Sequence, residues 1–174
     1  LGAQAGDRLK VAALCSLGDS KSADAENAGN AQLNVDVTAI TMNGDVITSC
    51  VIDSVQAKVA FDATGAITSD ITAAVATKNE LGENYGMVAW GGAIAEWNEQ
   101  AAALAAYVEG MTMDEVKGIV ITADGKPEDA DLAASATMYL GGFLGKSPFV
   151  VDVMYDTHKK LLLFFYSLNT IAQF

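Results

Sequence analysis

A predicted β-hairpin is the feature that most constrains the fold of this chain. Residues 33–40 alternate apolar and polar side chains, which is the period of a strand with one buried face. The dipeptide Asn43-Gly44 follows, and it is the strongest short signal for a tight turn between antiparallel strands. Residues 45–52 are rich in Val, Ile and Thr, as a returning strand requires. These residues therefore predict an antiparallel sheet.

Flanking segments extend this hairpin into a predicted β-meander. Residues 9–17 are apolar and suit a first strand, whereas the small polar residues 18–30 suit a loop. Residues 55–61 alternate again and predict a further strand. Residues 66–75 suit either another strand or a short capped helix, and we favour a strand followed by a helical turn.

The clearest helical signal covers residues 94–108. Apolar side chains recur there every three or four residues, and we place the polar residues Glu96, Glu99 and Gln100 outside that buried stripe. Gly110 is positioned to end the helix.

Two shorter segments complete the predicted order. The capping-box sequence that starts at Thr112 predicts a helix through Val116, and the β-branched residues 119–122 predict a short strand. This order predicts an α+β fold, in which an antiparallel β-meander is packed on one face by two to three helices. The 174 residues suit a single domain, 1–174.

Charge and composition narrow the classes of partner and of chemistry. Ten Lys and Arg residues against 22 Asp and Glu residues give a net charge of -12, which repels phosphate backbones, so we expect no nucleic-acid partner. Two Cys and one His are too few for a tetrahedral zinc site. The chain has no Walker-type phosphate loop and no Gly-x-Ser-x-Gly elbow, and His158 lies beside two lysines in a predicted turn. We therefore predict no catalytic residues.

The N-terminus suggests export. The chain starts at Leu1 without Met and without an apolar signal segment, so we expect a mature or truncated extracytoplasmic protein, secreted or anchored as a lipoprotein. Disulfides persist in that environment. Cys15 and Cys50 both lie in predicted strands of one sheet, and we predict that they are close enough to form a disulfide. Two buried thiols are the alternative.

The C-terminal segment, residues 147–174, has a different pattern. Residues 149–155 and 161–166 are apolar runs on either side of a polar turn, and they predict an antiparallel hairpin. The second run is far shorter than the roughly 20 residues needed to span a bilayer, so we expect no membrane span. Its apolar faces need cover from the domain or from a second copy, which would make a homo-oligomer.

Residues 131–137, Asp-Leu-Ala-Ala-Ser-Ala-Thr, place a carboxylate before small side chains and a hydroxyl, so another molecule can approach closely. The run resembles the attachment motif of FMN-binding domains, in which Asp, two variable residues, Ser or Thr, Gly, Ala and Thr occur in that order. Ala134 replaces the Ser or Thr of that motif, and Ser135 replaces its Gly. The matching residues are Asp131, Ala136 and Thr137. The same run also suits an N-capped helix with a buried face that includes Leu132 and Tyr139.

The resemblance covers about residues 31–145 and implies a cofactor site. In that family a separate transferase joins the phosphate of FMN to the last Thr of the motif, which implies attachment at Thr137, with Ser135 as the rival hydroxyl. The resemblance implies that Asp131 orients the segment or helps to hold the metal that the transferase reaction needs, and that the loop of residues 81–87 contacts the flavin ring. The cofactor-binding residues implied in this way are Thr137, Asp131, Ser135, Ala136, Leu81, Gly82 and Tyr85.

Two functions therefore remain open. The first is an extracytoplasmic FMN-binding domain that carries electrons through its flavin to an unknown redox partner, and it would be at most a flavin-carrying electron-transfer protein. The alternative is a non-catalytic secreted or surface domain that binds a small ligand or a partner without flavin.

Overall fold

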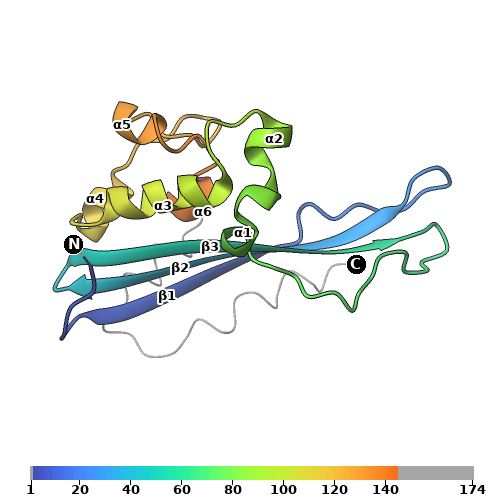
Figure 1. Ribbon diagram of the computed structural model, residues 1–174, viewed down its shortest axis with the longest axis horizontal. Helices are drawn as coiled ribbons and strands as arrows, with labels where there is room; N and C mark the ends of the chain where they lie inside the picture. Colours follow the sequence, from blue (N-terminus) through green and yellow to red (C-terminus); the bar gives the residue numbers. More distant parts are fainter. Residues whose placement is uncertain (1, 145–174) are drawn as a thin grey trace.

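A computed structural model describes residues 2–144 as a three-stranded antiparallel sheet with short helices above one of its faces (Figure 1). The predicted α+β fold is confirmed. The apolar hairpin expected within residues 147–174 lies outside the described residues.

The sheet has the strand order β1-β2-β3 and is built around the predicted hairpin. Gly44 and Asp45 form its turn, and Gly44 has a φ of 60°, which glycine adopts without strain. Residues 45–52 and 55–61, predicted as two strands, form one strand because Asp53 and Ser54 continue the pairing with β2. The strands are β1 (Arg8–Ser16), β2 (Gly29–Asn43) and β3 (Val46–Phe61).

Residues 66–75 do not form the predicted strand. Only Ile67 makes an isolated bridge, to Phe61, among these residues. The carboxylates of Asp62 and Asp70 accept hydrogen bonds from main-chain N–H groups two residues further on, at 2.8 Å in both cases. Such local bonds hold the backbone in turns and compete with strand pairing.

The longest helix, α3 (Trp97–Val108), starts later than predicted. Glu96 is its N-cap and forms a capping box with Glu99, so Ile94 lies before the helix and is 58% exposed. Gly110, with a φ of 86°, follows the end of α3 as predicted.

Other helices are single turns. Residues 77–87, predicted as a loop, contain two of these turns and lead into a third. The capping box of Thr112 with Glu115 opens α4 as predicted. Residues 119–122 make only one isolated bridge, between Ile121 and Pro127, in place of the predicted strand. The short elements are α1 (Lys78–Leu81), η1 (Gly82–Tyr85), α2 (Met87–Gly91), α4 (Met113–Lys117), α5 (Ala130–Ala133) and α6 (Gly141–Leu144).

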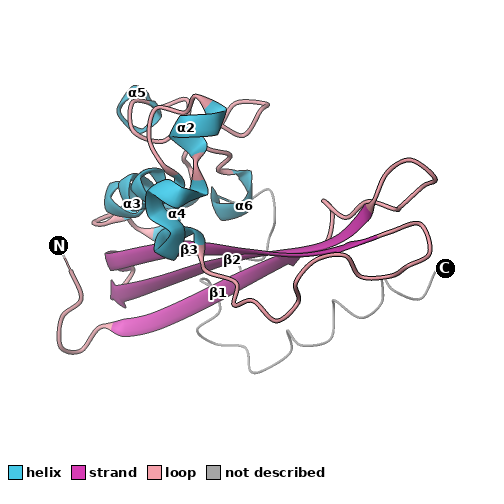
Figure 2. Ribbon diagram, turned by 45° about the vertical axis from the view of Figure 1, so that its right-hand side comes forward, coloured by secondary structure: helices cyan, strands magenta, loops and turns pink. Residues whose placement is uncertain are grey.

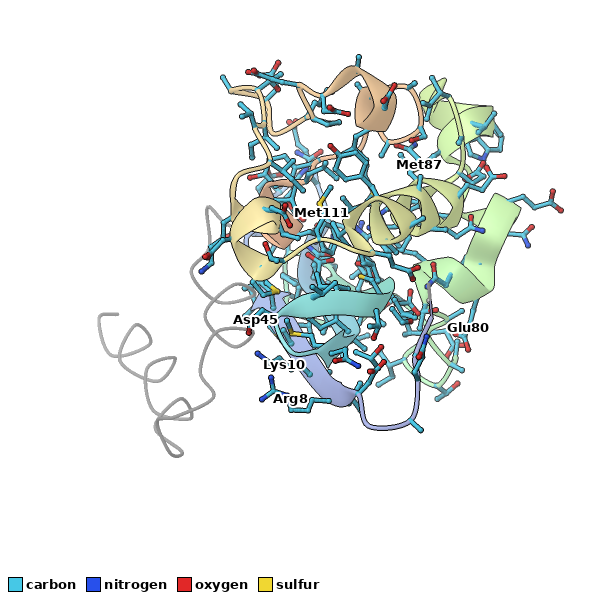
Figure 3. The ribbon with its side chains drawn as sticks, turned by 90° about the vertical axis from the view of Figure 1, so that its left-hand side faces the viewer. Arg8, Lys10, Asp45, Glu80, Met87 and Met111 are labelled. Atoms are coloured by element: carbon cyan, nitrogen blue, oxygen red, sulfur yellow. The ribbon has the colours of Figure 1, made fainter. Side chains whose placement is uncertain are left out.

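The core lies between the sheet and α3, and side chains fill the space between them (Figure 3). Ala101, Leu104 and Val108 of α3 are buried in this core, together with Ile40 and Ile52 of the sheet. Figure 2 shows the helices gathered on this side of the strands. On the opposite face, by strand alternation, lie the exposed apolar side chains of Leu9, Val11 and Val51. One sheet face therefore carries the helical layer in the described part of the chain.

Candidate ligand-binding site

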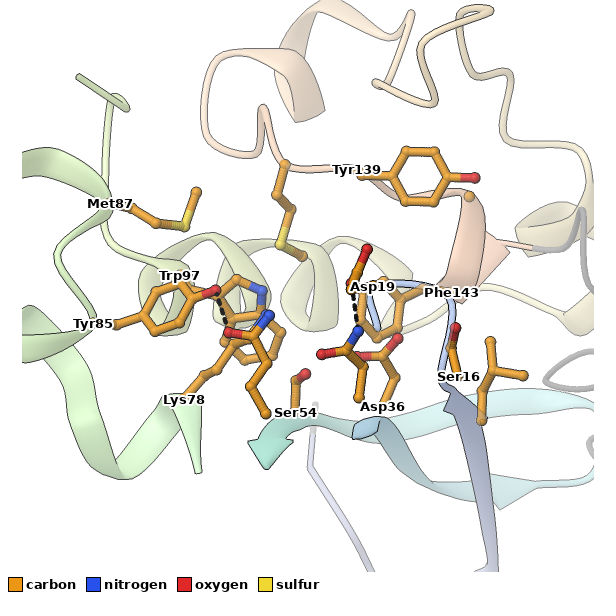
Figure 4. A pocket seen from close by; sticks show the side chains of 15 residues that line it. Ser16, Asp19, Asp36, Ser54, Lys78, Tyr85, Met87, Trp97, Tyr139 and Phe143 are labelled. Atoms are coloured by element: carbon orange, nitrogen blue, oxygen red, sulfur yellow. Dashed lines mark hydrogen bonds between the residues drawn. The ribbon is translucent and has the colours of Figure 1, made fainter. Parts of the chain in front are cut away.

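A cavity of about 770 Å³ opens between the sheet and the helical layer (Figure 4). Its floor comes from two rows of residues. Each row crosses the three strands, and its members are directly paired on neighbouring strands. Side chains two apart on a strand share one face, so these rows present their side chains to the helices. The rows are Leu14, Asp36 and Ser54, and Ser16, Asn34 and Gln56.

The walls of the cavity are mostly aromatic rings and thioethers. They come from α1, η1, α2 and α3 on one side and from residues 138–143 on the other. Apolar rings with a few polar groups are the usual lining of a small-molecule site, whose volume is about 300–1,000 Å³. The wall residues are Lys78, Tyr85, Met87, Trp97, Met138, Tyr139, Gly141 and Phe143.

Charge is unevenly distributed along the cavity. The Lys78 ammonium lies 4.9 Å from the centroid of the Tyr85 ring and 5.0 Å from that of Trp97, within range of cation–π attraction. Lys78 is the only Lys or Arg among the described residues that line the cavity. Asp36 and Asp19 lie toward its other end, where Asn34 Nδ2 donates to the Asp19 carboxylate at 2.6 Å (Figure 4). The cavity thus carries its positive charge on the α1 side and its negative charge over β2 and the residues that follow β1.

Ser54 brings an unpaired polar group to the floor. Its side chain is 1% exposed, and its Oγ has no hydrogen-bond partner among the described residues. Such buried orphan groups are rare, and a ligand or a water can supply the missing partner. Next to it, the Tyr85 hydroxyl donates to Gln56 Oε1 at 3.3 Å, a long O–H···O hydrogen bond at the edge of the floor.

Gln100 positions the segment that carries the predicted attachment residue. Its Oε1 accepts hydrogen bonds from Thr137 N at 2.7 Å and from Met138 N at 2.8 Å, and its Nε2 donates to the Ala95 carbonyl at 2.8 Å. Gln100 is completely buried. Its predicted place outside the buried stripe is therefore wrong. Its spacing of three residues after Trp97 is the sequence signal that could have found it.

The run of residues 131–137 does not form the single helix that its composition also suits. The α5 helix ends at Ala133, and its N-cap is Asp129, whose carboxylate accepts from the main-chain N–H of Asp131 and Leu132. Leu132 is buried as predicted, whereas Tyr139 is 60% exposed because the chain leaves the helix before it.

The structure places the predicted cofactor residues in two regions. Tyr85 lines the cavity, and Leu81 and Gly82 precede it in the same helical segment without reaching the lining. Thr137 is half-buried and directly precedes Met138 of the cavity wall. The others lie away from the lining: Asp131 and Ser135 are exposed, and Ala136 is fully buried.

The predicted disulfide is wrong. Cys15 of β1 lies opposite Val35, and Cys50 of β3 lies opposite Ile40, five residues further along β2. Neighbouring strands are about 4.8 Å apart, so the intervening β2 alone separates the two cysteines by more than the roughly 7 Å that a disulfide tolerates. Both are free thiols, Cys15 exposed and Cys50 buried. Burial, with a smaller contribution from the negative charge of Glu109, raises the pKa of Cys50 to about 12.

Comparisons with protein-family models, curated proteins and solved structures gave no match. Within residues 2–144, no group of three or more His, Cys, Asp or Glu side chains is arranged to hold a metal ion. The helices described there are all too short or too polar to cross a membrane.

Proposed function

We propose that this protein is an FMN-binding domain that carries electrons outside the cytoplasm, with the flavin ring held in the cavity between the sheet and the helices. The observation that carries this proposal is the cavity itself, whose wall of rings and thioethers includes Met138, the residue that follows Thr137. A planar, largely apolar ring with polar edges suits this lining of rings, thioethers and a few hydrogen-bonding groups.

The residues present fit the ring of FMN. Tyr85, Trp97 and Met138 offer apolar faces, and the orphan hydroxyl of Ser54 offers a hydrogen-bonding group to a polar edge. When bound, the flavin supplies the electron-transfer chemistry, and the protein supplies binding, orientation and electrostatics.

Thr137 is the proposed attachment residue. Its Oγ1 lies 3.4 Å from Gln100 Oε1, which is long for an O–H···O hydrogen bond, so the hydroxyl is only weakly held. Its main-chain N–H is bound firmly to the same oxygen at 2.7 Å. Gln100 thus fixes the backbone of the segment and leaves the hydroxyl available.

The test is co-expression of the full chain with a flavin transferase, followed by intact-mass measurement. We expect a flavin-sized mass increment in the wild type and in Ser135→Ala, and none in Thr137→Ala. Purified wild type mixed with FMN should also quench flavin fluorescence without a covalent bond. No increment, no quenching and no flavin released on denaturation would overturn the proposal.

A second candidate is a binding domain that takes a ligand other than flavin. Asp19 and Asp36 favour it, because two carboxylates at one end of the cavity repel a phosphate group. The departures from the attachment motif at Ala134 and Ser135 favour it as well. Binding of neutral or cationic planar molecules by a wild type that binds no flavin would support this alternative.

A further inference from the structure

We propose that Lys78 is the specificity-determining residue of the cavity and that its ammonium group recognises a negatively polarised carbonyl oxygen on the ring of a planar heterocyclic ligand. This inference rests on the proposed flavin site and adds the residue that selects the ligand's chemistry.

The charge of Lys78 lies at the aromatic wall of the cavity. Lys78 is the first residue of α1, is half-buried, and lies against the rings of Tyr85 and Trp97. It makes no ion pair with a described acidic residue. Cation–π attraction holds the charge at the ring faces but satisfies no N–H donor in a linear hydrogen bond. The ammonium group therefore has donors available for an acceptor in the cavity.

Charges of opposite sign line different parts of the cavity. Asp19 and Asp36 repel negative charge at one end, and Lys78 attracts it at the other (Figure 4). A planar ligand whose electron-rich edge faces Lys78 places that edge beside the positive charge and away from the two carboxylates, whereas the reverse orientation places it beside them. The side chains thus select an orientation as well as a charge.

The hydroxyl of Ser54 lies in the floor of the same cavity, and its Oγ lacks a partner among the described residues. A ring edge that carries both an N–H group and carbonyl oxygens, as the pyrimidine edge of a flavin does, offers an acceptor to Lys78 and a partner of either kind to Ser54. A ligand with an apolar edge would leave both groups unpaired.

The experiment titrates the full-length protein with lumiflavin, riboflavin and FMN, which share the ring and differ in the side chain and the phosphate. Quenching of flavin fluorescence gives the Kd for the wild type, Lys78→Met, Lys78→Arg and the exposed control Lys58→Met. We expect Lys78→Met to raise all three Kd values by about tenfold, the size of one charge-assisted hydrogen bond in a partly exposed site. Lys78→Arg should stay within about threefold of wild type, and Lys58→Met should not change.

A spectral pH titration of bound lumiflavin gives a second readout. The positive charge of Lys78 favours the deprotonated ring, so the ring N–H should ionise at lower pH in the wild type than in Lys78→Met. A purely structural role for Lys78 would not move this pKa. If Lys78→Met fails to fold by circular dichroism, Lys78→Gln removes the charge in its place.

Each outcome decides between the two proposals. Equal losses for the three flavins support the assignment, whereas a loss confined to FMN means that Lys78 binds the phosphate and overturns it. Unchanged binding in Lys78→Met overturns the role of Lys78 and leaves the flavin site standing. A wild type that binds none of the three flavins overturns both.

Discussion

Two buried polar residues, Gln100 and Ser54, lie near the cavity in opposite states of hydrogen bonding. Gln100 satisfies both ends of its amide with main-chain groups from residues 95, 137 and 138. Ser54 leaves its hydroxyl unpaired among the described residues. A buried polar group without a hydrogen-bond partner destabilises the fold by more than a typical hydrogen bond stabilises it. Substitutions at these two positions should therefore have different consequences for stability.

Replacing Gln100 by Met should destabilise the protein by about 2–4 kcal/mol, because Thr137 N and Met138 N both lose their acceptor. Urea unfolding measures the change, and Ala102→Met, at an exposed position of the same helix, is the matched control. A loss below about 1 kcal/mol would show that the two N–H groups find another acceptor.

Ser54→Ala should leave the ligand-free protein as stable as wild type or more stable by up to about 1 kcal/mol, because it removes an orphan polar atom. Flavin affinity should fall in the same variant. Thermal unfolding and fluorescence titration measure the two effects, with Ser49→Ala, a less buried serine of the same strand, as control. Destabilisation by more than about 1 kcal/mol would mean that Ser54 Oγ has a partner in solution.

The two cysteines should differ sharply in reactivity. Cys15 is exposed, whereas Cys50 is buried and its thiol pKa is raised to about 12, so little reactive thiolate forms at neutral pH. N-ethylmaleimide at pH 7.5 should therefore add once to the native protein, at Cys15, and twice after unfolding in urea. Intact mass and peptide mapping measure this. A native protein that takes no adduct until it is reduced would contain the disulfide that the geometry excludes.

At the scale of elements, a single carboxylate joins α2 to the start of α3. Glu96 is 8% exposed, and its two oxygens accept hydrogen bonds from Met87 N at 2.8 Å and Val88 N at 3.0 Å. The α2 helix has only five residues and no side-chain N-cap of its own, so Glu96 satisfies its first two N–H groups. The wall that carries Met87 therefore depends on a residue of the next helix.

Glu96→Ala should lower stability by about 2–3 kcal/mol and speed the hydrogen exchange of the Met87 and Val88 amides, because two charge-assisted bonds are lost. Glu83→Ala, at an exposed carboxylate of the preceding turn, should change neither property. Unchanged exchange at Met87 would contradict the role given to Glu96.

At the scale of the whole molecule, acid has two opposite effects on the stability of the fold. Protonation of carboxylates relieves the repulsion within a net charge of -12, but it also breaks the hydrogen bonds that these carboxylates accept. The Thr48 hydroxyl holds the pKa of Asp7 below its usual value, and the Thr64 hydroxyl does the same for Asp62. The pKa values of Asp24, Asp70 and Glu115 are lowered as well, by hydrogen bonds from neighbouring residues. Each of these groups binds protons less readily in the folded state than in the unfolded chain.

Stability should therefore be constant from neutral pH to about pH 5 and should fall as the pH drops through the usual carboxyl range toward these lowered values. The unfolded chain binds more protons than the folded protein in that range, so the free energy of unfolding decreases as the pH falls. Urea unfolding at constant ionic strength, repeated from pH 7 to pH 3, measures it, and Asp7→Asn should make the fall shallower. A rise in stability on acidification would mean that relief of charge repulsion dominates.

Elements whose signals lie within a few neighbouring residues were predictable from the sequence alone. Alternation over residues 33–40 and the Asn43-Gly44 dipeptide predicted the central hairpin, and the capping box at Thr112 predicted α4. Strand period and caps depend on side chains no more than four positions apart. The order of these elements also predicted the α+β class.

Features that depend on distant partners became visible only in the folded chain. Residues 53 and 54 continue β3 because β2 pairs with them, and β2 also separates the two cysteines. Gln100 is buried because it meets main-chain groups 37 and 38 residues away in the sequence. The cavity brings together residues from 14 to 143. The helical period could have indicated that Gln100 is buried, but no local period or cap identifies its partners, because contacts at such separations follow from how the sheet and helices pack.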